Sequence, residues 1–316
     1  MNTNNSDWTV VSTAPDSLGE SPFWHPTEKM LYWIDIPGQK ICRTTLDGAV
    51  TENWSLTQEP GCIAPAQRGG LIIALRDGIY RASHWQADLV KIASVNYDTA
   101  NTRFNDGKCD TAGRLWAGSM FEPRTQRSAA LYRLDARDTE DGKVAPKFDI
   151  MQRNAVLANG LGWSPDNKTI YWADTVDNVI SAWDWEETSG EMTNKRIFQK
   201  FEAKPKGWTA DNNMGIDYKG RPDGCAIDVE GNYYAAMYEG QRLLKFAPTG
   251  ELLADIPTPT KCTTMPCFGG DDMKTLFITT SRQMRSEAEL KAQPLAGHVF
   301  AMDVDVPGLP VNFYQD

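Results

Sequence analysis

Short apolar runs recur along the chain, separated by turn-forming residues at intervals of about 8–12 residues, a spacing typical of all-β folds. Two runs, L-I-I-A-L at 71–75 and T-L-F-I-T at 275–279, are rich in β-branched and aromatic side chains. Dipeptides such as Asp77-Gly78 and Thr249-Gly250 provide the turns. Helical periodicity is almost absent. The pattern therefore predicts a protein built of short antiparallel strands.

One unit of this pattern is clearest at residues 223–253. Its strand-like segments are D-G-C-A-I-D-V, Y-Y-A-A-M-Y, R-L-L-K-F and E-L-L, and the turns between them are E-G-N, E-G-Q and A-P-T-G. Four antiparallel strands in roughly 30 residues make a unit the size of one propeller blade. We therefore interpret residues 223–253 as one blade.

Five weaker copies complete the pattern, so that units begin near residues 20, 61, 105, 159, 223 and 264. The spacings are 41, 44, 54, 64 and 41 residues, and three of the five fit propeller repeats of about 40–50 residues. The sequence predicts a six-bladed β-propeller with four antiparallel strands per blade and a central channel, forming a single domain over residues 1–316. Residues 1–7 are expected to be a disordered terminus.

Two further features of the propeller follow from the same pattern. A strand-like segment at 8–12 precedes the first unit, and we expect it to pair with the last blade and close the ring. The longest gap contains the polar, turn-rich segment 203–214. We expect a loop there that lies over the mouth of the channel.

Four of the six units open on a side chain with an oxygen donor, 10 or 11 residues before the next apolar run. These residues are Glu20, Asn105, Asn159 and Asp223. The first strand of each blade lines the channel, so the four should converge at one mouth. Two carboxylates buried together resist joint ionisation, and a divalent cation would offset that cost. Taken singly, each residue could equally be a turn or cap residue.

The oxygen donors favour Ca²⁺, Mg²⁺ or Mn²⁺, with Fe²⁺ and Zn²⁺ also open. Asn105 is a candidate for either the metal or the substrate. Asp106 is expected to be a supporting or turn residue. The six cysteines have no framework spacing and the three histidines add no matching pattern, so we predict buried thiols and no Cys/His zinc site. Neither G-x-S-x-G nor H-E-x-x-H is present.

The charge balance limits the partners. Lys and Arg total 32 against 42 Asp and Glu, a formal charge of −10, which argues against nucleic acid and anionic membrane surfaces. No apolar run approaches the roughly 20 residues of a membrane span. The start M-N-T-N-N-S-D-W lacks the basic and apolar regions of a secretory signal. We expect a cytoplasmic protein unless a signal has been removed; its oligomeric state is left open.

Six ordered motifs between about residues 16 and 302 carry a family resemblance. They are L-G-E-S-P-F-W at 18–24, R-F-N-D-G-K at 103–108, N-G-L-G-W-S at 159–164, P-D-G-C-A-I-D at 222–228, C-F-G-G-D-D at 267–272 and A-G-H-V-F at 296–300. Together they resemble the signatures of the senescence-marker-protein/gluconolactonase (regucalcin-like) family. That resemblance implies a six-bladed propeller, one catalytic divalent metal and hydrolysis of sugar lactones.

The resemblance also implies roles for individual residues. The metal ligands would be Glu20, Asn159 and Asp223. Substrate contacts would come from Arg103 and Asn105. An acidic residue follows the family's G-[ST]-M segment, which here is 118–120. Glu122 takes that role, while Pro123 stands at a second position that is acidic in relatives.

The expected reaction is metal-dependent hydrolysis of an aldonolactone to the aldonic acid, within carbohydrate metabolism. The metal would polarise the carbonyl and activate water, with Asp223 as both ligand and general base. Arg103 would bind sugar hydroxyls or the developing oxyanion. Two alternatives stay open: an esterase of the arylesterase or paraoxonase kind, and a non-catalytic calcium-binding propeller.

Overall fold

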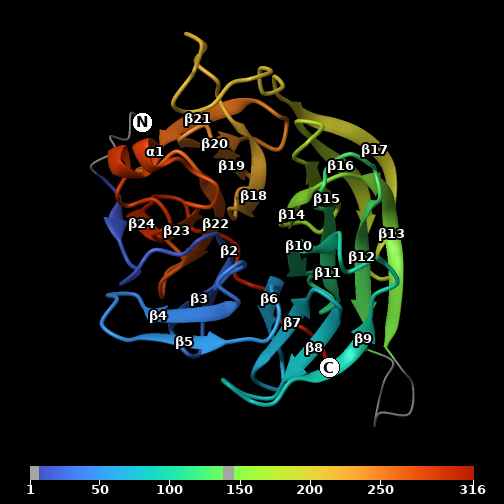
Figure 1. Ribbon diagram of the computed structural model, residues 1–316. Helices are drawn as coiled ribbons and strands as arrows, with labels where there is room; N and C mark the ends of the chain where they lie inside the picture. The colour runs from blue at the N-terminus through green and yellow to red at the C-terminus, as the bar shows by residue number, and fades with distance from the viewer. Residues whose placement is uncertain (1–6, 138–145) are drawn as a thin grey trace.

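Six four-stranded antiparallel sheets surround a central channel in the computed structural model, which describes residues 7–137 and 146–316 (Figure 1). The predicted six-bladed propeller with four strands per blade is therefore confirmed. The expected disordered terminus at 1–7 lies outside the described residues except for Asp7. The prediction that residues 1–316 form a single domain includes residues that the structure does not describe, so it stays a prediction.

The first three blades follow chain order from the channel outwards. Blade 1 contains β2 (Gly19–His25), β3 (Met30–Asp35), β4 (Lys40–Thr45) and β5 (Thr51–Ser55). Blade 2 contains β6 (Pro60–Pro65), β7 (Leu71–Leu75), β8 (Gly78–Ala82) and β9 (Val90–Ser94). Blade 3 contains β10 (Thr102–Cys109), β11 (Leu115–Phe121), β12 (Ala129–Asp135) and β13 (Lys147–Ala155).

The last three blades complete the ring. Blade 4 contains β14 (Ala158–Trp163), β15 (Thr169–Asp174), β16 (Val179–Glu186) and β17 (Glu191–Lys200). Blade 5 contains β18 (Arg221–Ile227), β19 (Tyr233–Tyr238), β20 (Arg242–Phe246) and β21 (Leu252–Pro257). Blade 6 contains β22 (Thr263–Gly269), β23 (Thr275–Thr280), β24 (Phe300–Asp303) and β1 (Thr9–Val10), and the helix α1 (Glu287–Ala292) lies between β23 and β24 in the chain.

The N-terminal strand closes the ring, as predicted. In β1, Thr9 pairs with Ala301 and Val10 with Phe300, both in β24. Trp8 adds a link to blade 5, because its indole Nε1 donates to the carbonyl of Pro257 at 2.8 Å. The chain's two ends therefore contribute to one sheet, which covers the edge that β24 would otherwise expose.

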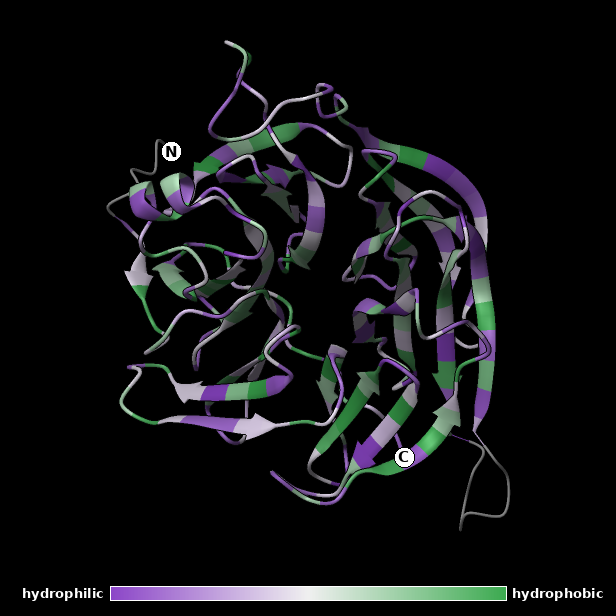
Figure 2. Ribbon diagram, in the orientation of Figure 1, coloured by the Kyte–Doolittle hydropathy of each residue, from purple (hydrophilic) through white to green (hydrophobic). Residues whose placement is uncertain are grey.

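Apolar side chains pack between neighbouring blades. Between blades 3 and 4, the ring of Trp185 meets Trp116 at 5.2 Å and Trp163 at 5.9 Å, both edge to face. Burial falls towards the rim: β3 is buried along its whole length, whereas most of β17 is exposed. Figure 2 shows hydrophilic and hydrophobic residues mixed along the outermost strands on the right-hand side of the ring.

A register shift interrupts the innermost strand of every blade near the start of each predicted unit. The shifts lie between Glu20 and Phe23, Pro60 and Cys62, Phe104 and Gly107, Asn159 and Gly162, Pro222 and Cys225, and Thr263 and Pro266. A bulge bends its strand and re-aims a side chain. Equivalent positions of the six units thus have equivalent local geometry.

The longest insertion is a loop, as predicted, but its expected place over the channel mouth is wrong. Residues 201–220 contain no helix or strand, and Figure 1 shows the tip of this segment beyond the outer edge of the ring, above β21. Its own packing explains the position: Trp208 is buried, meets Tyr218 edge to face at 5.1 Å and donates from Nε1 to the carbonyl of Ile216.

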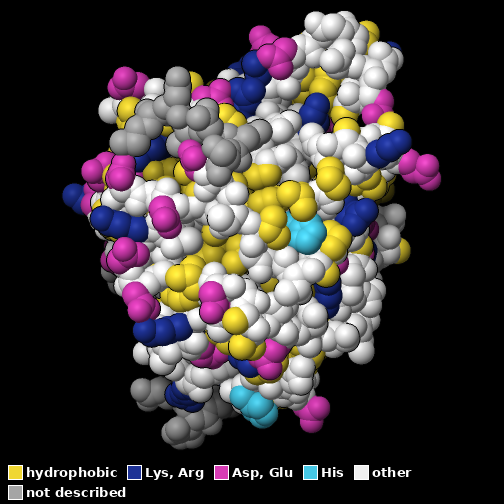
Figure 3. Space-filling model, turned by 90° about the vertical axis from the view of Figure 1, so that its left-hand side faces the viewer, with side chains coloured by type: hydrophobic (Ala, Val, Ile, Leu, Met, Phe, Trp, Pro, Cys, Tyr) yellow, Lys and Arg dark blue, Asp and Glu magenta, His cyan; other side chains and the backbone are white. Residues whose placement is uncertain are grey.

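Other sequence expectations concern the cysteines and the surface. All six cysteines are buried and unpaired, as predicted. In the described part of the chain, no helix has the length and apolar character needed to cross a membrane. On the face drawn in Figure 3, basic side chains alternate with acidic ones and do not form a continuous basic patch.

Ring closure gives a testable prediction on stability. Trp8 packs in a core cluster shared by blades 5 and 6, so Trp8→Ala should lower the free energy of unfolding by about 3 kcal/mol. The matched control is Val10→Ala in the adjoining strand β1, where the side chain is 43% exposed and the expected change is within about 0.5 kcal/mol. Urea unfolding followed by tryptophan fluorescence measures both. Equal losses in the two variants would contradict the role of Trp8.

Candidate functional site

Four polar residues that open innermost strands are buried where the register shifts. Their exposed fractions are 6% for Glu20, 6% for Asn105, 2% for Asn159 and 8% for Asp223. Each begins or borders the bulge of its strand. Arg103, two residues before Asn105 in β10, is buried as well, at 7%. Burial of this many polar groups requires partners for each of them.

A chain of hydrogen bonds connects Arg103 with Asn159 through Asn105. The Nη1 of Arg103 donates to Asn105 Oδ1 at 2.9 Å. The Nδ2 of Asn105 donates to Asn159 Oδ1 and to the carbonyl of Ala158, both at 2.9 Å. Both hydrogens of the Asn105 amide are therefore used inside the protein. Three of the predicted site residues lie in direct contact, drawn from blades 3 and 4.

Thr175 connects the same network to the strand that carries Asp223. Asn159 Nδ2 donates to Thr175 Oγ1, which donates to the carbonyl of Pro222, each at 2.7 Å. Pro222 directly precedes Asp223. Thr175 was not predicted from the sequence, because it belongs to none of the motifs. The one feature that could have indicated it is its position directly after β15, the strand that pairs with β14.

Electrostatics show that Glu20 and Asp223 share one environment. Burial and the negative charges of Asp223 and Asp106 raise the pKa of Glu20 well above its ordinary value. Burial also raises the pKa of Asp223, to about 8, and the negative charge of Asp106 adds to this shift. The positive charges of Arg221, Arg124 and Arg103 act in the opposite direction. The carboxyls are thus close enough to resist joint ionisation.

Asp106 is the third buried carboxyl at this mouth, and burial raises its pKa too. Its Oδ2 accepts from the backbone N–H of Leu161 at 3.0 Å. Its Oδ1 is enclosed and has no hydrogen-bond partner among the described residues. An orphaned carboxylate oxygen beside two further carboxyls indicates a place where positive charge would be stabilising. Asp106 is therefore placed among the buried polar groups of this mouth, which favours the supporting role among the two roles expected from sequence.

These groups suit a hard divalent cation. Glu20 and Asp223 offer carboxylate oxygens, and Asn159 offers an amide oxygen whose orientation is set by Thr175 and Asn105. Oxygen-rich sets with two negative charges are typical of Ca²⁺, Mg²⁺ and Mn²⁺ sites. Within 7–137 and 146–316, no three His, Cys, Asp or Glu side chains are grouped to hold a metal ion. The candidate centre thus depends on Asn159 as its neutral ligand.

Glu122 lies beside Arg103 but is engaged by Arg76. The carboxylate of Glu122 accepts from Arg76 Nη1 at 2.9 Å and Nη2 at 3.1 Å, and lies 3.6 Å from Arg103 Nε. Burial alone would raise the pKa of Glu122, but the two arginines lower it overall. The structure therefore brings Glu122 next to the predicted set through Arg103, with its oxygens already paired.

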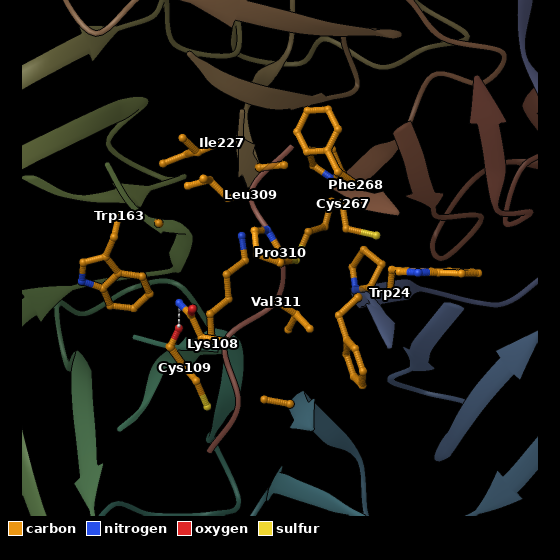
Figure 4. Close-up of a pocket in the computed structure, with 18 of the residues that line it drawn as sticks. Trp24, Lys108, Cys109, Trp163, Ile227, Cys267, Phe268, Leu309, Pro310 and Val311 are labelled. Carbon is orange, nitrogen blue, oxygen red and sulfur yellow. Dashed lines mark hydrogen bonds between the residues drawn. The ribbon is translucent and has the colours of Figure 1, made fainter. Parts of the chain in front are cut away.

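A cavity lies on the far side of the bulges from these residues. Its volume is about 300 Å³ and its lining includes Trp24, Trp163, Phe268 and Val311 (Figure 4). The ammonium of Lys108 enters it and donates to the carbonyl of Cys225 at 2.5 Å. None of the predicted site residues lines this cavity. The polar cluster and the apolar cavity thus occupy opposite parts of the channel.

Comparisons with known proteins agree with the geometry. Residues 18–282 match the family described as SMP-30/gluconolactonase/LRE-like region. The chain is 37% identical over 300 residues to 6-deoxy-6-sulfogluconolactonase of Pseudomonas putida, covering 94% of this chain and 95% of that protein. It is 33% identical over 301 residues to regucalcin of Gallus gallus, covering 93% of each.

Solved structures show the same fold. The calcium-binding protein regucalcin of Agrobacterium tumefaciens superposes with a TM-score of 0.84 at 24% identity, covering 96% of both chains. The gluconolactonase XC5397 of Xanthomonas campestris gives a TM-score of 0.69 at 21% identity, covering 95% of this chain and 89% of that one. At these identities the likeness establishes the propeller and no finer property.

The raised pKa of Asp223 predicts that cation binding releases protons. With a pKa of about 8, Asp223 is largely protonated at pH 6.5, so a cation must displace that proton. Affinity for Ca²⁺ or Mn²⁺ should rise up to tenfold per pH unit below about 8 and level off above it. Calorimetry at pH 6.5 in buffers of different ionisation enthalpy measures the released proton. Affinity independent of pH from 6 to 8 would contradict this assignment.

The link through Thr175 predicts a second effect on the cation. Thr175→Val keeps the shape but removes the hydroxyl that orients Asn159, and should weaken cation binding about tenfold or more. Thr279→Val is the matched control, because Thr279 is also buried and its hydroxyl bonds only within blade 6. Titration with Mn²⁺ compares the two. Equal affinities in both variants would show that Thr175 does not position the ligand.

Proposed function

Because the chain belongs to the SMP-30/gluconolactonase/LRE-like family, we propose that it hydrolyses a sugar lactone, an aldonolactone, to the aldonic acid with one bound divalent cation. The observation that carries this proposal is the gathering of buried acidic and amide groups at the bulges of one channel mouth. The lactonase name of the P. putida relative supports the reaction class. The calcium-binding description of the A. tumefaciens protein supports a divalent cation.

Glu20, Asn159 and Asp223 would hold the cation. When bound, a divalent cation supplies polarisation of an ester carbonyl and lowers the pKa of a water molecule. The identity of the cation is not fixed by the oxygen donors, which suit Ca²⁺, Mg²⁺ and Mn²⁺ and admit Zn²⁺ or Fe²⁺. The cytoplasmic location and the role in carbohydrate metabolism expected from the sequence belong to the same proposal.

Asp223 is the proposed general base. One of its oxygens suffices to hold a cation, which leaves the second to accept a proton from the attacking water. Burial, and with it the charge of Asp106, raises the pKa of Asp223 and so makes it a better proton acceptor. Water adds to the carbonyl carbon, the ring C–O bond breaks, and the ring oxygen leaves as a hydroxyl after taking up the proton.

Arg103 is the proposed donor to the substrate. Its Nη1 is occupied by the carbonyl of Phe104 and by Asn105. Within the described part of the chain, its Nη2 meets only Met120 Sδ at 3.5 Å, a weak acceptor. The Nη2 hydrogens are therefore available to a sugar hydroxyl or to the oxyanion that forms when water attacks.

Asn105 and Glu122 have narrower proposed roles. The donors of Asn105 are used by Ala158 and Asn159, so it can offer the substrate only the remaining lone pair of Oδ1. Glu122 can accept from a sugar hydroxyl at the exposed side of its carboxylate, which is 33% accessible. Both residues would therefore contact hydroxyl groups and not the reacting carbonyl.

Substitution of the acidic ligands tests the proposal. Glu20→Gln and Asp223→Asn should each lower kcat/KM for aldonolactones at least a hundredfold while the fold persists, because a ligand charge and the base are lost. Asp211→Asn, in an exposed position of the insertion, is the control. The measurement is base consumption at constant pH over five- and six-membered aldonolactones with each cation in turn, after subtraction of spontaneous hydrolysis.

The outcomes separate the alternatives. Activity equal to wild type in both ligand variants would refute the assignment. Hydrolysis of phenyl acetate without hydrolysis of any aldonolactone would favour an arylesterase-like or paraoxonase-like enzyme. Cation binding with no hydrolysis above the cation-free control would favour a non-catalytic calcium-binding propeller.

A further inference from the structure

Three cations converge on the single carboxylate of Glu239 at the end of β19. Lys204 Nζ lies 2.8 Å from both carboxylate oxygens of Glu239. Arg221 Nη1 lies 3.0 Å from Oε2, and Arg285 Nη1 lies 2.9 Å from Oε1. The side chain of Glu239 is only 2% exposed. One buried negative charge therefore fixes three positive groups drawn from the insertion, β18 and the loop before α1.

Positive charge exceeds negative charge in this cluster. Among the described residues, one further carboxylate joins it, that of Glu289, which lies 3.0 Å from Arg285 Nε. The guanidinium of Arg221 is also held over the ring of Tyr238 at 5.0 Å. A cluster with a purely structural role would be expected to balance its charges, especially in a chain with a net charge of −10. The cluster thus holds more cations than carboxylates in a chain that is acidic overall.

Arg124 adds a fourth cation with no partner of its own. It lies in the turn two residues after Glu122, where its N–H donates to the carbonyl of Phe121 at 2.9 Å. In the described ranges, no carboxylate forms an ion pair with Arg124. Desolvation and the charge of Arg221 lower the pKa of Arg124, while Asp223 and Glu239 act in the opposite direction. The charged groups that influence Arg124 thus belong to blade 5 and the residue that follows β19.

Arg124 and Glu239 are two of the fourteen described non-glycine residues that have a positive φ. Arg124 has φ of +56° and Glu239 has φ of +67°, a region that residues other than glycine seldom adopt. Such conformations persist only where surrounding contacts enforce them, and they gather at ligand-binding sites. The unpaired cation and the carboxylate that organises the other three are thus both held in costly conformations.

The cluster borders the candidate site. Arg221 precedes Asp223 by two residues, a separation of about 7 Å along a strand. The charges of Arg221 and Arg124 both act on Asp223. Arg103, which lies in β10, also acts on Asp223 through its charge. A lactone whose carbonyl lies at Asp223 could extend its far end towards Arg124 and Arg221.

We propose that Arg124 and Arg221, backed by Arg285, form a subsite for an anionic group on the substrate, at the end of the sugar remote from the lactone carbonyl. This inference rests on the proposed lactonase function and narrows it to acidic aldonolactones. The planar guanidinium presents paired donors that match the oxygens of a carboxylate, phosphate or sulfonate. Arg285 and Lys204 keep Glu239 neutralised, which leaves the charges of Arg221 and Arg124 for the ligand.

The experiment compares matched lactones on the cation-loaded enzyme. Glucono-1,5-lactone is the neutral substrate, and its counterparts carry phosphate, sulfonate or carboxylate at C6. The anionic lactones should have the higher kcat/KM, and the preference should fall as salt is added. Arg124→Gln should reduce the ratio of anionic to neutral kcat/KM by about tenfold to a hundredfold, the effect of losing one charge-assisted contact. The rank among the three anions identifies the group.

Arg127→Gln is the matched control. Arg127 lies in the same loop but already pairs with both oxygens of Asp177 at 2.7 Å, so the ratio should not change. The subsite would be overturned if the neutral lactone were hydrolysed as well as every anionic one and Arg124→Gln did not change the ratio of anionic to neutral kcat/KM. That result would leave the lactonase proposal standing.

If no lactone is hydrolysed, the lactonase proposal fails. The anion subsite is then tested by measuring the binding of a neutral and an anionic sugar. Glucose 6-phosphate should then bind at least tenfold more tightly than glucose, and Arg124→Gln should abolish the difference. Equal binding of the two sugars would overturn the inference.

Discussion

The arrangement of this propeller depends on the cost of enclosing like charges. Glu20, Asp106 and Asp223 are carboxyls gathered at one channel mouth, each with its pKa raised chiefly by burial. Protonation relieves that cost at low pH, and a cation relieves it at neutral pH. Hydrogen bonds alone do not relieve it, because one oxygen of Asp106 has no hydrogen-bond partner in the ranges that the structure describes. A protein that only needed a stable channel would be better served by apolar residues at these positions. The three buried carboxyls are therefore best explained as groups that bind a cation.

The ring makes this gathering possible without a shared sequence neighbourhood. Glu20 and Asp223 are more than 200 residues apart in the chain, yet each sits at the bulge of an innermost strand. Closure places six such bulges around one axis, and the pairing of β1 with β24 completes the circle. Hydrogen bonds between blades then fix the side chains: Asn105 connects to Asn159, and Thr175 connects blade 4 to blade 5. The precision of the site comes from strands and not from loops, as preorganised chemistry requires.

The repeat pattern was sufficient to predict the blades, the ring closure and the convergence of the four polar residues, because each follows from a periodic feature. Thr175 could not be predicted, since its contact with Pro222 depends on how two blades meet. The charge excess around Glu239 was equally hidden: Lys204, Arg221 and Arg285 come from three separate segments. The insertion at 203–214 was placed wrongly because its polar composition indicates a loop but not its direction, which is set by the burial of Trp208. Periodic sequence features specify strands, whereas contacts between non-periodic segments depend on how those segments fold against each other.

The two ends of the channel differ in a way that bears on how such a protein could change specificity. Beyond the bulges, the channel is an apolar cavity crossed by the segment 309–312, and its lining belongs to the packed interior of the blades. Alterations there would disturb the core. At the polar mouth, the groups proposed to hold the cation lie on strands, while Arg124 and Arg285 lie on connections between elements. Connections tolerate substitution better than strands do. Two of the three arginines of the proposed subsite thus lie outside the strands that carry the proposed cation ligands, whereas Arg221 shares β18 with Asp223. A change in the charge of the substrate would therefore be accommodated first at Arg124 and Arg285.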